Sequence, residues 1–131
     1  MNKVQGSDST SRIEVLDSRH IAQLKSLKVS GKTTLFHELS LIFRRETPVR
    51  MTNLRAAIRS QDAVEVARLS HGFVGSLASL GARQMQVLVK ALELSASEAD
   101  WPAVTAGLEQ VEQAWKRLQG ALEERDQEAE P

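Results

Sequence analysis

Residues 68–82 read RLSHGFVGSLASLGA, and this stretch places one histidine on the outer side of an amphipathic helix. At about 100° per residue, the segment 62–80 gathers its large apolar residues on one stripe, namely Val66, Leu69, Phe73, Leu77 and Leu80. His71 lies roughly opposite that stripe, among the small residues Ala67, Gly75 and Ala78. The spacing therefore predicts an exposed imidazole in a clearing that another molecule can approach closely.

Two glycines strengthen this prediction, because a glycine inside a helix costs about 1 kcal/mol relative to alanine. Gly72 and Gly75 both fall within the predicted helix. Gly75, one turn after His71, removes a side chain that would crowd the ring. A lone exposed histidine is usually only a solvated residue. The clearing favours a functional interpretation of His71.

Composition limits the class of protein. The chain has 131 residues, 41% of them hydrophobic, which suits one domain with a single core. Lysine and arginine total 17, as do aspartate and glutamate, and only 4% of residues are aromatic. A neutral chain with few aromatic side chains gives no reason to expect a nucleic-acid partner. The absence of cysteine excludes disulfides and thiolate metal sites.

The polar start of the chain lacks the apolar core of a signal peptide, and no apolar run approaches the roughly 20 residues that span a bilayer. We therefore expect no membrane insertion by this segment and a cytoplasmic location. Residues 1–12 are rich in glycine, serine and threonine, which predicts a disordered lead or linker.

The rest of the chain carries helical spacing and no strand signal. We expect an all-α fold, an up-and-down antiparallel four-helix bundle with an additional N-terminal helix, over residues 13–124. Residues 125–131 are predicted to form an acidic, frayed tail. The N-terminal helix starts near Asp17 and takes its apolar face from Ile21, Leu24 and Leu27. Asp62 and Asp100 are candidate helix caps, and Gly81 suits the end of the histidine helix.

The second predicted helix begins after Thr33 or Thr34 and carries a proline in its middle. Pro48 is expected to bend or break it near Glu46 and Thr47. Its predicted core residues are Leu35, Leu39, Ile42, Phe43, Val49, Leu54, Ala57 and Ile58. In the following helices, the predicted core positions are Met85, Leu88, Val89, Leu92, Val104, Leu108, Val111, Trp115, Leu118 and Leu122.

The pattern of His71, an apolar Phe73, then Gly75-Ser76 and Leu80-Gly81-Ala82, followed by Leu88, Leu92 and Glu93, resembles the histidine-phosphotransfer (HPt) domains of multistep phosphorelays. The resemblance covers most of the chain. It implies that His71 accepts a phosphoryl group and that Glu93 orients the ring by hydrogen bonding. The family commonly has lysine at the position of Val74. Arg68, one turn before His71, is a candidate substitute for that lysine.

The chemistry of imidazole agrees with this role. A neutral ring has one unprotonated nitrogen that can attack an acyl phosphate. The sequence lacks a glycine-rich ATP loop with lysine and an acidic cluster suited to Mg²⁺. We therefore expect a phosphocarrier and not a kinase, with no cofactor of its own. By resemblance, its partners are response-regulator receiver domains, which supply the phospho-accepting aspartate and Mg²⁺.

Val64, Ala67, Val74 and Ala78 are expected to form an apolar rim around His71 that docks the partner. The chain could be freestanding or the C-terminal module of a hybrid sensor histidine kinase. A regulatory or scaffold bundle that docks a partner through the same face without phosphotransfer is the alternative. His20 and His37 have no neighbours at metal-ligand spacing, so no metal site is expected.

Overall fold

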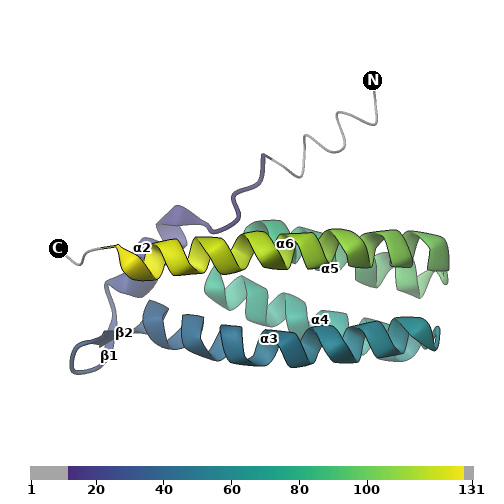
Figure 1. The fold of residues 1–131 in the computed structure, drawn as a ribbon, viewed down its shortest axis with the longest axis horizontal. Coiled ribbons are helices and arrows are strands. Elements are labelled where there is room, and N and C mark those ends of the chain that lie inside the picture. The colour runs from purple at the N-terminus through teal and green to yellow at the C-terminus, as the bar shows by residue number, and fades with distance from the viewer. Residues whose placement is uncertain (1–11, 129–131) are drawn as a thin grey trace.

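The computed structural model describes residues 12–128, and Figure 1 shows its helices and strands. In chain order the elements are α2 (Ser18–Lys25), β1 (Lys28–Ser30), β2 (Thr33–Thr34), α3 (Leu35–Arg59), α4 (Ala63–Leu80), α5 (Arg83–Ser97) and α6 (Trp101–Gln127). The four long helices lie side by side along the long axis, with α2 and the small hairpin at one end. The predicted four-helix bundle with an additional N-terminal helix is confirmed.

The bundle closes on itself, because α4 packs between α3 and α5 and α6 packs between α5 and α3. One core cluster lies towards the α2 end and includes Phe36, Phe43, Phe73 and Leu118. A second cluster lies around Leu54, Val66, Leu92 and Val104. Both clusters contain residues of α4, so burial fixes the rotation of the helix that carries His71.

The turns between the long helices each contain a residue with positive φ: Gln61, Gly81 and Ala99. Gly81 has φ +80°, and a Cβ there would lie 2.7 Å from His20 Cδ2, so glycine is required at this turn. Asp62 caps α4 by accepting a hydrogen bond from the Glu65 backbone N–H, and Asp100 caps α6 in the same way. These caps were predicted.

Helix α3 differs from the prediction, because it runs unbroken from Leu35 to Arg59 with Pro48 inside it. Pro48 is exposed, so water can solvate the carbonyl that the proline ring leaves without a donor. The continuous helix also changes the buried face. Ile42 and Val49, predicted as core, are 40% and 60% exposed, while Ser40 and Thr47 are buried. The Thr47 hydroxyl avoids a burial penalty by donating to the Phe43 carbonyl, 2.6 Å away.

A second difference is the antiparallel hairpin of β1 and β2, where no strand was predicted. Two strands of three and two residues are too short to show a period of two in the sequence. The predicted apolar residue Leu27 lies after the end of α2 and is 52% exposed. Leu16, just before α2, is buried in the core.

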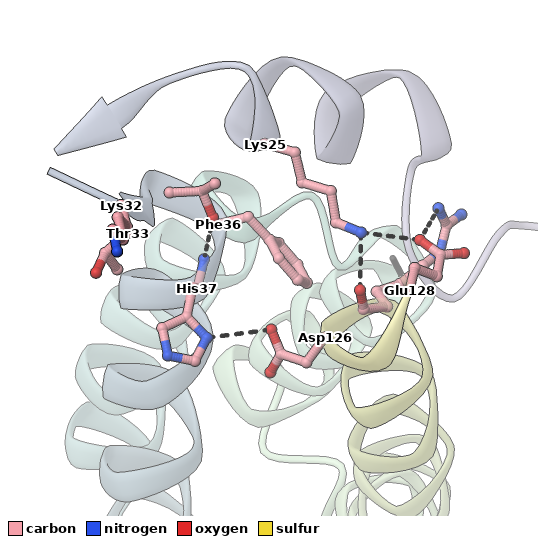
Figure 2. Close-up of a pocket in the computed structure, with 9 residues that line it drawn as sticks. Lys25, Lys32, Thr33, Phe36, His37, Asp126 and Glu128 are labelled. Atoms are coloured by element: carbon pink, nitrogen blue, oxygen red, sulfur yellow. Dashed lines mark hydrogen bonds and ion pairs between the residues drawn. The ribbon is translucent and has the colours of Figure 1, made fainter. Parts of the chain in front are cut away.

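The end of α6 is the third difference, since the helix continues to Gln127 and residues 125–127 are not frayed. The Asp126 carboxylate accepts hydrogen bonds from the Ser40 hydroxyl and from Arg44 on α3. It also lies 3.5 Å from His37 Nδ1, as Figure 2 shows. Lys25 of α2 donates to the Arg125 carbonyl and to Glu128. Polar contacts to α2 and α3 thus hold the last turn. Residues 1–11 and 129–131 lie outside the described residues.

The hollow in Figure 2 lies between α2, the hairpin and the end of α6. Its carboxylates and its Lys25 ammonium are already paired within the chain. Within residues 12–128, no helix is long and apolar enough to cross a membrane.

Candidate functional site

His71 lies in the middle of α4 with its side chain 84% exposed. The helix holds it there because Phe73 and Leu77, on the opposite face, are 1% and 0% exposed. Turning α4 to bury His71 would expose these side chains to water, at a cost of about 1.5–3 kcal/mol for each. The core of the bundle therefore keeps the imidazole on the surface.

Glu93, from the neighbouring helix α5, lies beside the imidazole. Its Oε2 is 3.9 Å from His71 Nδ1, which is close enough for charge attraction but too long for a direct hydrogen bond. The Glu93 side chain is 30% exposed. The carboxylate thus lies on the Nδ1 side of the ring.

Arg68, the candidate substitute for the missing lysine, is engaged by Glu65. Its Nε donates to Glu65 Oε1 at 2.8 Å, and Nη2 donates to the other carboxylate oxygen. The Arg68 hydrogen bond lowers the pKa of the Glu65 carboxyl, and Glu65 in turn raises the pKa of the Arg68 guanidinium. This pair forms on the turn before His71 and directs the guanidinium towards the N-terminal end of α4.

The two glycines leave the helix surface beside His71 bare. A Cβ built on Gly75 would have no heavy atom within 4 Å. A Cβ on Gly72 would meet only Arg50 Nη1, 3.5 Å away. The surface around His71 is therefore open enough for another molecule to approach the ring.

Comparison with known proteins agrees with this arrangement. The family model for the Hpt domain matches residues 38–128, which is most of the chain. The chain belongs to the Hpt domain family. Histidine-containing phosphotransfer protein B (HptB) from Pseudomonas aeruginosa PAO1 has a similar fold, with a TM-score of 0.75 and 23% identity; the match covers 88% of this chain and 97% of that one. The search of curated proteins found no match.

An apolar groove runs beside His71, between α4 and α5. It has a volume of about 550 Å³ and is lined by Ala67, Val87, Lys90, Ala91, Glu93, Leu94 and Ser97. Val87 and Leu94 are 43% and 62% exposed, and Val64 at the start of α4 is 81% exposed. Exposed apolar side chains gathered beside a polar site are typical of protein interaction surfaces.

The predicted rim around His71 is only partly exposed. Ala67 and Ala78 are half-buried, and Val74 packs against the core cluster instead of standing free on the surface. Val74 and Ala78 lie on the same side of α4 as Ala67, which lines the groove between α4 and α5. The exposed apolar residues that the sequence analysis missed, Val87 and Leu94, belong to α5.

Sequence reasoning also missed Arg50 on α3. Its Nη2 donates to the Ser76 hydroxyl at 3.0 Å, and its guanidinium carbon lies 5.7 Å from the centre of the Phe73 ring. The contact joins residues 26 positions apart, which no local spacing could indicate. Among the described residues, no group of three or more histidine, aspartate and glutamate side chains could hold a metal ion.

Proposed function

We propose that this Hpt domain is a phosphocarrier that accepts a phosphoryl group on His71. The single observation that carries the proposal is the exposed imidazole of His71 on α4, with the Glu93 carboxylate 3.9 Å from Nδ1. An accessible ring nitrogen is what reversible phosphorylation of a histidine requires, and the acidic neighbour supports it.

In the proposed transfer, no group of this chain other than His71 forms or breaks a bond. The Nε2 lone pair attacks the phosphorus of an aspartyl phosphate, the P–N bond forms, and the P–O bond to the aspartate breaks. The aspartate leaves as a carboxylate. Nδ1 keeps its proton, so the phosphorylated ring carries a delocalised positive charge that Glu93 stabilises. In the reverse direction a receiver aspartate attacks the same phosphorus, and His71 leaves as neutral imidazole.

The proposed partner is a response-regulator receiver domain, which docks on the groove between α4 and α5. Val64, Val87 and Leu94 supply apolar contact area next to His71. The receiver domain holds Mg²⁺, which neutralises charge on the phosphoryl group during transfer. In this proposal the domain works in the cytoplasm, either on its own or as a module of a hybrid sensor kinase.

The test is phosphotransfer from a phosphorylated receiver domain, with Mg²⁺, to the purified chain. Wild type should acquire label that is labile in acid and stable in alkali, and His71→Gln should acquire none. His37→Gln is the matched control, because His37 is also an exposed histidine but lies on α3 beside Asp126. It should be labelled as wild type is.

Equal labelling of His71→Gln would refute the assignment of His71. A wild-type chain that binds receiver domains and never acquires label would instead favour the scaffold alternative, in which the docking face is kept without the chemistry.

The role of Glu93 is tested separately. Glu93→Gln removes the charge beside Nδ1 while keeping the size of the side chain, and it should lower the yield of phosphohistidine. Glu98→Gln, an exposed glutamate just after α5, is the matched control. An unchanged yield in Glu93→Gln would remove Glu93 from the proposed site.

A further inference from the structure

Arg50 places a positive charge beside the helix surface that carries His71. It is half-buried on α3 and crosses to α4, where it contacts the Ser76 hydroxyl and the Phe73 ring, and its Nη1 lies 3.5 Å from where a Cβ would stand at Gly72. All three α4 residues lie within five positions of His71. The guanidinium is therefore anchored near the site by a helix that does not contain the histidine.

The partners of Arg50 are all uncharged. Along residues 12–128, Arg50 forms no ion pair, whereas Arg44, Arg55 and Arg83 each contact a carboxylate. A guanidinium that is partly removed from water favours an anionic partner. Arg50 thus retains the capacity to bind an anion that arrives at this surface.

The glycines of α4 lie between Arg50 and His71. Taking His71 as the origin and 100° per residue, Gly75 is about 40° and Gly72 about 100° around the helix, before Ser76 at about 140°. At these two positions, therefore, no side chain stands between the imidazole and the Arg50–Ser76 contact. A Cβ at Gly72 would already touch Arg50 Nη1 at 3.5 Å, so a longer side chain would stand between the guanidinium and the imidazole.

We propose that Arg50 contacts the phosphoryl group on His71 and neutralises its charge, from α3 and across Gly72. This inference rests on the proposed phosphorylation of His71. A phosphoryl group brings a charge near −2 and three acceptor oxygens, which the planar fork of an arginine binds well. Position 74 holds valine, which carries no charge, and Arg68 already donates to both carboxylate oxygens of Glu65.

The test measures the equilibrium yield of phosphohistidine after transfer from a phosphorylated receiver domain. Arg50→Met should lower the equilibrium constant for transfer to His71, worked out from that yield, about 10- to 100-fold, the range expected for loss of a charged hydrogen bond. Arg45→Met is the matched control, because Arg45 is an exposed arginine of the same helix. It changes the net charge equally and should keep the wild-type yield.

Two further measurements separate charge neutralisation from a structural role. Arg50→Gln keeps a donor for the Ser76 hydroxyl and should show the same loss of yield, while Arg50→Lys should retain most of the yield. Binding of each unphosphorylated variant to the receiver domain should stay within about twofold of wild type, since the charge acts on the phosphoryl group.

A wild-type yield in Arg50→Gln would overturn the inference. In that case, labelling of wild type and its absence in His71→Gln would leave the proposed function intact. Equal labelling of His71→Gln would instead refute the proposed function, and the role of Arg50 with it.

Discussion

Replacing Gly75 by alanine should stabilise the protein and impair its function. Gly75 lies inside α4 with φ outside the left-handed region, and a Cβ there would meet no heavy atom within 4 Å. Alanine is therefore accommodated without strain. Its higher helix propensity should raise the free energy of unfolding by about 1 kcal/mol, part of it from the reduced freedom of the unfolded chain.

The matched control is Gly120→Ala. Gly120 lies inside α6, is exposed, and would also have an open space around its Cβ. Both variants should move the urea midpoint upwards by a similar amount. Only the change at Gly75 should slow phosphotransfer, because Gly75 borders His71.

A side chain larger than alanine at position 75 should have a larger effect on the rate of phosphotransfer. Gly75→Leu should slow transfer about tenfold or more, since displacing reacting groups by about 1 Å can cost ~10²-fold in rate. The assay is single-turnover transfer from a phosphorylated receiver domain. A stabilised Gly75→Leu that transfers at the wild-type rate would refute the reasoning that the bare surface serves the approach of a partner.

Three other predictions concern stability. Asp62→Ala removes the cap on the Glu65 N–H and should lower the free energy of unfolding by about 1 kcal/mol in urea titrations; an unchanged midpoint would contradict the role of the cap. Phe73→Ala should cost about 3–5 kcal/mol, because Phe73 is 1% exposed, and a loss below 1 kcal/mol would show that the core collapses around the gap. The His20 N–H and Arg83 lower the pKa of the Asp17 carboxyl, so its stabilisation exists above the unfolded pKa and is lost as pH falls through the folded pKa. Asp17→Asn should therefore weaken the dependence of the free energy of unfolding on pH as pH falls below the ordinary aspartate pKa of about 3.9. An identical pH dependence in the variant would refute this assignment.

The sequence predicted the parts of the fold that depend on local chemistry. Asp62, Gly81 and Asp100 mark helix ends through their own hydrogen bonds or φ, so they could be assigned one at a time. The apolar stripe of α4 likewise predicted an exposed His71, because helical periodicity places that residue on the face opposite the stripe. Each of these signals needs only a few neighbouring residues.

The errors came from interactions between distant segments. Pro48 was predicted to bend or break its helix, but α3 packs against α4 and α6 and continues without a break. The same packing sets which residues of α3 are buried. Asp126 lies in the acidic C-terminal segment that was predicted to be frayed, yet its carboxylate accepts hydrogen bonds from Ser40 and Arg44. Arg50 of α3 donates to Ser76 of α4, 26 positions further along the chain. The spacing of residues in the sequence could not predict this contact.

The most direct test of the account is the site of phosphorylation in the wild-type chain. After transfer from a phosphorylated receiver domain, ³¹P NMR should show a phosphoramidate, and mapping under alkaline conditions should place it on Nε2 of His71. Phosphate on Ser76, Ser79 or another histidine, or its absence despite stable binding of the receiver domain, would contradict the central claim.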